Sequence, residues 1–216
     1  MSSRVEPIVM DIHLPPGIAG PEPLDFDVRC FLVAHASGVV LIDVGPAGSQ
    51  DAISTGLERV GARWHDITDV VLTHGHADHI GGLTDVIANA GRPAVWAGVE
   101  DHPAIAFNGE LQALEEGGTV RDLRVLQTPG HTPGHRSLFL VQESILFTAD
   151  IIGSIAGTLS RGPAPFTADP EEAERSLRRV VGLEFERVLF SHGAEVADPV
   201  RDLRGLLNAE RPPSKG

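Results

Sequence analysis

Three imidazoles and a carboxylate occupy six consecutive positions of this chain. Residues 74–79 read His-Gly-His-Ala-Asp-His. Side chains two positions apart on an extended chain point the same way, so His74 and His76 can contact one ion. Imidazole and carboxylate are ligands that zinc, iron and manganese all accept. The cluster therefore predicts a site for a divalent metal ion, and for two ions if further ligands join it. The alternative for the cluster by itself is a solvated loop.

Further candidate ligands follow short apolar runs elsewhere in the chain. Residues 70–72, 125–126, 145–147 and 188–190 are apolar, and a histidine or an aspartate follows each run within a few positions. Such runs, closed by glycine, proline or threonine, are typical of buried strands. Ligands at strand ends converge on one edge of a sheet, so we expect one pocket. Its candidates are His74, His131, His135, Asp150 and His192. Spacing alone assigns no ligand to a particular ion, and Asp150 by itself is also compatible with a helix cap or a turn.

Hydrophobic patterning predicts the elements that carry these residues. Helices are predicted at 49–60, 80–90, 169–181 and 198–208, and the last two open with Asp-Pro, a cap followed by a residue favoured in the first turn. Two loops, 14–23 and 152–166, are expected to border the pocket. Strands are predicted at 5–13, 26–34, 38–43, 67–73, 94–97, 122–127, 136–142, 144–148 and 187–190.

Together these motifs resemble the metallo-β-lactamase superfamily of metallohydrolases over most of the chain. The resemblance implies an α/β (α+β) fold, an αββα sandwich of two mixed β-sheets packed face to face with helices outside. It implies that Asp43, at a strand end in Leu-Ile-Asp-Val-Gly, supports the ligand loop without binding metal. His135, the second histidine of Thr-Pro-Gly-His-Thr-Pro-Gly-His, is expected to form a hydrogen bond nearby. The implied ligands are His74, His76 and His131 for one ion, Asp78, His79 and His192 for a second ion, and Asp150 as the bridge between them.

The implied ligand set favours hydrolysis with two divalent ions, zinc first and iron or manganese as alternatives. Zinc lowers the pKa of bound water from 15.7 to about 7, which makes hydroxide available at neutral pH. The expected reaction is attack by a metal-bridging hydroxide on a small ester, thioester or lactone. Asp78 and Asp150 are the predicted catalytic carboxylates, Asp78 to orient the hydroxide or pass a proton and Asp150 to hold the two ions together.

The substrate is less defined than the site. The bridging Asp150 argues against a classical β-lactamase, and the absence of tyrosine weakens the resemblance to quorum-quenching lactonases. Only 24 residues follow His192, which leaves little room for the basic helical segment with which glyoxalase II enzymes hold glutathione. In the second loop, Arg161 is a candidate contact for an anionic substrate group, and Ile155, Leu159 and Phe166 are candidates for an apolar wall. An ordinary surface arginine is the competing interpretation.

Two other classes of function use the same residues. Persulfide dioxygenases resemble this family and hold one iron, for which His131, Asp150 and either His74 or His76 would suffice. A non-catalytic metal-binding module is the third interpretation, which the completeness of both ligand sets disfavours.

Composition narrows the remaining choices. A formal net charge of −13 disfavours nucleic acid as a partner, because a polyanion needs basic residues to replace its counterions. No run approaches the ~20 apolar residues that cross a bilayer, and no signal peptide is evident, so a cytoplasmic protein without membrane contact is expected. Cys30 lies in an apolar run and is expected to be a buried thiol. We expect one domain, 1–216, acting on a small molecule; the sequence leaves open whether it forms a homo-oligomer.

Overall fold

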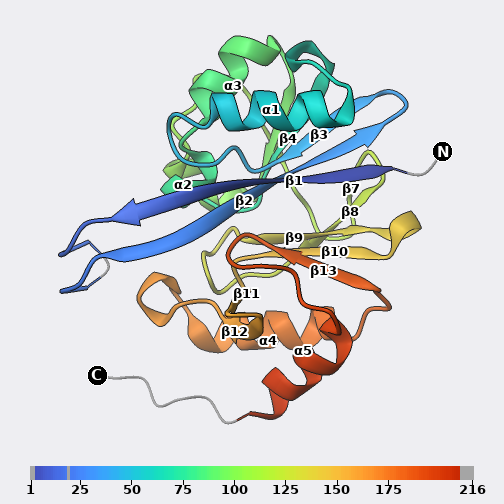
Figure 1. Ribbon diagram of the computed structural model, residues 1–216. Helices are drawn as coiled ribbons and strands as arrows, with labels where there is room; N and C mark the ends of the chain where they lie inside the picture. Colours follow the sequence, from blue (N-terminus) through green and yellow to red (C-terminus); the bar gives the residue numbers. More distant parts are fainter. Residues whose placement is uncertain (1–2, 19, 210–216) are drawn as a thin grey trace.

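Two mixed β-sheets form the centre of the computed structural model, which describes residues 3–18 and 20–209 (Figure 1). The first sheet begins antiparallel, from β1 to β3, and continues parallel from β3 to β6. Its strands lie in chain order: β1 (Arg4–Leu14), β2 (Leu24–His35), β3 (Gly38–Ile42), β4 (Ile67–Leu72), β5 (Ala94–Ala97) and β6 (Leu111–Ala113).

The second sheet is built from the C-terminal half of the chain. Its outer strand β13 runs parallel to β10, and its other neighbours are antiparallel. The order is β13 (Arg187–Phe190), β10 (Ile145–Ala149), β9 (Arg136–Leu140), β8 (Leu123–Gln127) and β7 (Thr119–Val120). A separate two-stranded hairpin joins β11 (Ile152–Ile155) to β12 (Thr158–Arg161).

Helices cover the outer faces of both sheets (Figure 1). Near the first sheet lie α1 (Gln50–Val60), the single turn α2 (Ala77–Ile80) and α3 (Leu83–Ala90), and near the second lie α4 (Pro170–Val181) and α5 (Pro199–Asn208). Short 3₁₀ segments complete the described elements: η1 (Trp64–Asp66), η2 (Val99–Ala104), η3 (Val141–Glu143) and η4 (Ala164–Phe166).

Three apolar clusters fill the spaces between these layers. Between the sheets, Val40 and Val71 of the first sheet belong to one cluster with Leu138 and Phe147 of the second. A second cluster joins the first sheet to α1 and α3, and a third joins the second sheet to α4 and α5. Each sheet is apolar on both faces, so one face packs against the other sheet and the opposite face is covered by helices. This packing produces the helix–sheet–sheet–helix order. The αββα sandwich predicted from the sequence is therefore confirmed.

Most predicted elements are found, with three differences. The predicted helix at 80–90 is interrupted at Gly81 and Gly82, which separate α2 from α3. A Cβ on Gly82 would lie 2.4 Å from the carbonyl oxygen of Val44, so this close approach of the backbone leaves no room for a side chain. The predicted loop 152–166 is wrong, because most of it is the β11–β12 hairpin followed by η4. Strands β6 and β7 are only three and two residues long and gave no pattern to detect.

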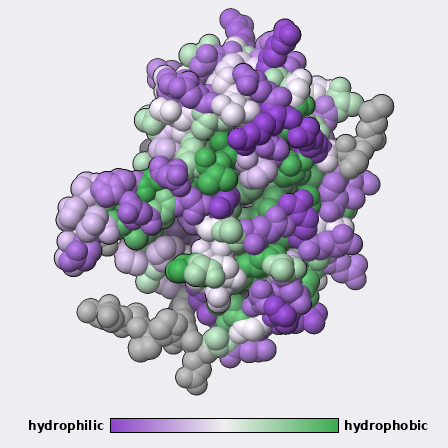
Figure 2. Space-filling model, viewed as in Figure 1, coloured by the Kyte–Doolittle hydropathy of each residue, from purple (hydrophilic) through white to green (hydrophobic). Residues whose placement is uncertain are grey.

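The predicted loop 14–23 is the tip of a long arm. Strands β1 and β2 pair from Arg4 opposite Ala34 to Leu14 opposite Leu24, beyond the body of the first sheet. The arm projects from the molecule in Figures 1 and 2, and its visible surface is mainly hydrophilic. Residue 19, within this tip, lies outside the described residues.

Two further expectations concern the core and the membrane. Cys30, in β2 of the first sheet, is fully buried in the apolar cluster that this sheet shares with α1 and α3, as predicted for a thiol in an apolar run. Across residues 3–18 and 20–209, no helix combines the length and the apolar character that a membrane crossing requires.

Candidate metal centre

The candidate ligands meet at one edge of the sandwich. His74 follows β4, His131 follows β8, Asp150 follows β10 and His192 follows β13. Strands β8, β10 and β13 point the same way, because β8 and β10 are both antiparallel to β9 and β13 is parallel to β10. Their carboxyl ends therefore lie together, as the sequence pattern predicted. The 74–79 loop brings the ligands of the first sheet to the same edge.

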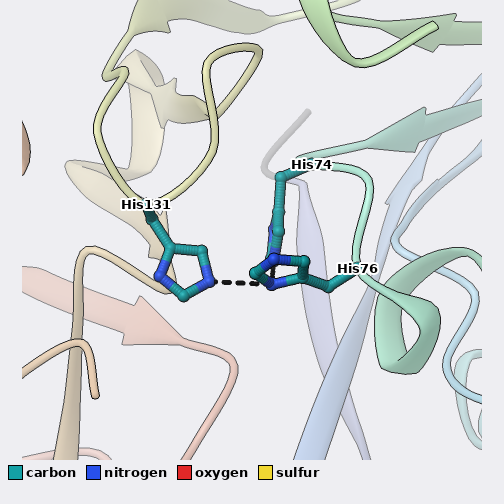
Figure 3. Close-up of side chains that lie close together, drawn as sticks. All are labelled: His74, His76 and His131. Atoms are coloured by element: carbon teal, nitrogen blue, oxygen red, sulfur yellow. Dashed lines mark hydrogen bonds between the residues drawn. The ribbon is translucent and has the colours of Figure 1, made fainter. Parts of the chain in front are cut away.

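The first ligand group consists of His74, His76 and His131. The Nδ1 atom of His76 lies 3.1 Å from Nε2 of His74 and 3.0 Å from Nε2 of His131, and the three rings point toward one another (Figure 3). Nitrogen atoms bound to a tetrahedral zinc ion at 2.0–2.1 Å lie about 3.3 Å apart. The spacing of these nitrogens is therefore that of three corners around one ion.

The second ligand group consists of Asp78, His79 and His192. An Oδ2 atom of Asp78 lies 3.6 Å from Nε2 of His79 and 3.5 Å from Nε2 of His192. Asp78 and His79 belong to the single turn α2, and His192 lies in the turn after β13. Their donor set, one carboxylate and two imidazoles, suits a second divalent ion.

Asp150 lies between the two groups. Its Oδ2 is 3.4 Å from Nε2 of His131 and 3.0 Å from Nε2 of His192, and its Oδ1 is 3.5 Å from Nε2 of His79. Its Oδ2 is also 3.9 Å from Nε2 of His74, so one carboxylate reaches two members of the first group and two members of the second. The preceding residue, Ala149, has a φ of +45°, an unfavourable conformation for an alanine, at a bulge that ends β10.

Two buried atoms at this centre lack hydrogen-bond partners. They are Nε2 of His79 and Oδ1 of Asp150, which face each other. A buried polar atom without a partner typically costs about 1–3 kcal/mol. A cation between them would satisfy both, since each has a lone pair available when the imidazole is neutral. The residues present therefore fit a metal ion.

The protonation of the two groups differs. Burial lowers the pKa of His74 well below its usual value, lowers that of His76, and lowers that of His131 to about 4, in each case against the attraction of Asp150. Burial also opposes the charged forms of His79 and His192, but Asp150 outweighs it at both, with Asp43 adding to the effect at His79. The pKa of His79 is raised well above its usual value, and that of His192 is raised.

The family comparison agrees with this geometry. Residues 24–192 match the family model described as the metallo-beta-lactamase superfamily. The chain belongs to this superfamily.

The chain is similar to hydrolases of this superfamily. The chain is 29% identical over 205 residues to a probable metallo-hydrolase, YflN, of Bacillus subtilis, covering 75% of this chain and 78% of that protein. It is 32% identical over 194 residues to a hydroxyacylglutathione hydrolase of Cereibacter sphaeroides, covering 86% and 69%. A solved metallo-beta-lactamase from Pontibacter korlensis has the same fold, with a TM-score of 0.73 at 18% identity over 95% of this chain and 97% of that one.

Asp43 is connected to the ligand loop by hydrogen bonds. Its Oδ2 accepts hydrogen bonds from Nδ1 of His79 at 2.9 Å and from the hydroxyl of Thr73 at 2.8 Å, and its Oδ1 accepts one from the Thr73 N–H. Because Nδ1 of His79 is engaged, Nε2 faces the centre. Asp43 has a φ of +57°, which aspartate tolerates better than most residues.

His135 contacts the bridge through the backbone. The N–H of Asp150 donates to Nε2 of His135 at 3.2 Å, so the ring proton resides on Nδ1, which donates to the hydroxyl of Thr128 at 2.9 Å. His192 is held in a related way, since its Nδ1 donates to the carbonyl oxygen of Asp27 at 2.7 Å. The structure thus places His135 behind the bridge and not among the groups that converge on an ion.

The structure gives the candidate substrate contacts of the 152–166 stretch other surroundings. The guanidinium of Arg161 donates to Glu174 at 2.7 Å and to the carbonyl oxygen of Leu206 at 2.9 Å, which connects β12 to α4 and α5. Leu159 is buried in the third apolar cluster, whereas Ile155 and Phe166 are exposed. Thr167, just after η4, contacts the ring of a ligand, with its hydroxyl 3.3 Å from Nδ1 of His131, and the N–H of Ser154 in β11 donates to the carbonyl oxygen of His192 at 2.9 Å.

One carboxylate at the centre was missed by sequence reasoning. Asp101, in η2, is buried and accepts hydrogen bonds from two ligand-bearing turns. In the sequence it stands in Val-Glu-Asp-His-Pro, where acidic residues are unremarkable and no neighbouring ligand marks it. Only the fold brings η2 against those turns.

Proposed function

We propose that this chain is a dinuclear metal-dependent hydrolase that cleaves a small-molecule ester, thioester or lactone. The observation that carries the proposal is the position of Asp150, whose carboxylate lies between two complete ligand groups and has a buried oxygen without a hydrogen-bond partner. A site for one ion would not need a second set of converging donors. The hydrolase relatives support the reaction class.

The donor set supports zinc, with iron or manganese as alternatives. The first ion would be held by His74, His76 and His131, the second by Asp78, His79 and His192, with Asp150 shared. Such ions lower the pKa of a water ligand toward neutrality and polarise a carbonyl oxygen.

The residues of the chain would divide the remaining work. Positive charge from His79 and His192 keeps the pKa of Asp150 well below its usual range despite burial, so Asp150 stays ionised and is unsuited to carry a proton. Asp78 is more accessible, with 27% of its side chain exposed against 5% for Asp150. We assign Asp78 to orient the attacking water, accept its proton and return it to the departing alcohol or thiol.

The net charge of the chain and the contacts of Arg161 narrow the class of substrate that we propose. A formal net charge of −13 supports a small molecule over a nucleic acid. The hydroxyacylglutathione hydrolase relative supports a thioester. However, Arg161 is paired with Glu174, so it offers no free cation for a glutathione carboxylate. The proposal therefore stays with the bond that is cleaved and does not extend to glutathione.

Metal content and turnover on one sample test this proposal. The protein, purified without chelator, is analysed for elements and assayed with a panel of thioester, lactone, ester and phosphodiester substrates. About two ions per chain with hydrolysis of an ester, thioester or lactone would support the proposal. One iron with oxygen consumption on a persulfide would replace it with the dioxygenase, and no stoichiometric ion after reconstitution would overturn it.

A further inference from the structure

A buried carboxylate in η2 contacts both turns that carry the first ligand group. Oδ2 of Asp101 accepts hydrogen bonds from the N–H of Gly75 at 2.9 Å and from the hydroxyl of Thr132 at 2.6 Å. Its Oδ1 accepts one from the N–H of Gly134 at 2.8 Å. Gly75 lies between two of the histidines, and Thr132 directly follows the third. Among the described residues, every hydrogen bond to this side chain comes from those two turns.

We propose that Asp101 is a positioning residue that sets the distance between the two turns, so that His76 and His131 can share one ion. These histidines are 55 positions apart in the chain, yet their ligand nitrogens lie 3.0 Å apart. A single rigid carboxylate bound to both turns fixes their separation, because neither turn can move without losing a hydrogen bond. The inference rests on the proposed metal centre and extends it to the residue that assembles its first half.

The backbone around Asp101 is packed to allow this contact. A Cβ on Gly134 would lie 2.5 Å from Cγ of Asp101 and 2.6 Å from its backbone nitrogen. Any larger residue at 134 would push η2 away from the turn. The N–H of Arg136, two residues later, donates to the carbonyl oxygen of Thr73 at 2.8 Å, which joins the same two chain segments from the other side.

The chain contains a matched control for this residue. Asp69, in β4, is buried to nearly the same extent as Asp101, 6% against 5% exposed. It also accepts three hydrogen bonds, from Trp96 at 3.0 Å, Arg121 at 2.8 Å and Thr68 at 2.9 Å. None of these donors belongs to a ligand turn. Asp69→Asn therefore reproduces the loss of a buried carboxylate without touching the link between the turns.

The test isolates the first ligand group. In a His192→Ala background, which removes one ligand of the second group, Asp101→Asn and Asp69→Asn are each introduced, and zinc affinity is measured by competition with a chelator. Asparagine has one acceptor oxygen, and its amide would face one of the N–H donors, so at least one turn is released. We expect Asp101→Asn to weaken zinc binding about 10–100-fold, as for other groups that orient ligands. Asp69→Asn should change it less than about threefold, while both variants lower the unfolding temperature of the metal-free protein.

Equal zinc affinities for the two variants would overturn the role of Asp101. If Asp101→Asn does not fold, Thr132→Val and Thr132→Ser take its place, because valine removes the hydroxyl and serine keeps it. Valine should weaken zinc binding about 3–10-fold, the range expected for one hydrogen bond, and serine should restore it. Identical affinities for valine and serine would also overturn the proposal. A wild-type protein that binds two ions but hydrolyses no panel substrate would overturn the hydrolase assignment and leave the Asp101 measurement intact.

Discussion

The two ligand groups of the centre differ in their side chains and in their exposure to solvent. The first has three imidazoles, two of them essentially inaccessible, with His74 0% and His131 1% exposed. The second includes a carboxylate and is more open, with Asp78 27% and His192 24% exposed. Burial keeps the first group neutral, whereas carboxylates favour the charged imidazoles of the second. The first group is therefore ready to accept an ion, and the second must release protons to do so.

Removing the bridge should have the largest effect, because Asp150 contacts both groups. Asp150→Ala is expected to lower metal content and kcat/KM together, with a loss of activity of at least about 100-fold. Elemental analysis and steady-state kinetics on the same preparation check this. Asp198→Ala, which removes a helix cap at α5, is the remote control and should retain both ions. Normal activity and two ions in the Asp150 variant would show that the carboxylate does not bridge.

Acidification should empty the second group first. Nearby carboxylates, Asp150 above all, raise the pKa values of His79 and His192 and so favour their protonated forms in the metal-free chain, and each proton must leave before an ion binds. Affinity at this group should therefore rise with pH up to the raised pKa values, by about tenfold per unit for each proton released. Burial lowers the pKa values of all three histidines of the first group, that of His131 to about 4, so affinity at this group should depend less on pH over the same range.

Chelator competition between about pH 5 and pH 8 measures this difference. Two binding steps with distinct pH slopes are expected, the steeper one absent from a His192→Ala variant. Calorimetry in buffers of different ionisation enthalpy would count the protons released. Equal slopes for both ions would remove the contrast between the groups.

The support of the second group should be separable from that of the first. Asp43→Asn keeps an acceptor for Thr73 but weakens the charged contact with Nδ1 of His79, whose other nitrogen, Nε2, faces Asp78 and Asp150. We expect the second ion to bind about 10–100-fold more weakly and the first to change little, the reverse of the pattern for Asp101→Asn. Zinc titration of both variants, each with the Asp69→Asn control, tests the contrast. A loss shared equally by the two ions would mean that the groups are not independently supported.

Local sequence carried much of the fold and the convergence of the ligands. The ends of strands β4, β8, β10 and β13 could be predicted because each apolar run stops at a polar residue, with a histidine or an aspartate within a few positions. The contribution of Asp101 could not, since its partners lie at Gly75 and at 132–134 and meet it only after the sheets pack. The β11–β12 hairpin was not predicted, because its strands are four residues each and carry little periodicity.

The smallest effect is expected at Arg161, which sequence analysis placed near the substrate. Its guanidinium is 19% exposed and pairs with Glu174, 16% exposed, so its contacts join the hairpin to α4 and α5 and leave both ligand groups untouched. Because this pair is mostly shielded from solvent and has an added hydrogen bond, Arg161→Ala should lower the free energy of unfolding by about 1 kcal/mol, the upper end of the range for exposed ion pairs. Metal content and KM should stay within about twofold of wild type, because neither depends on this pair. Denaturant unfolding and kinetics check the two halves of the statement. A large rise in KM for an anionic substrate with unchanged stability would instead mean that Arg161 leaves Glu174 to bind substrate. The substrate site would then reach from the more exposed second group to the β11–β12 hairpin.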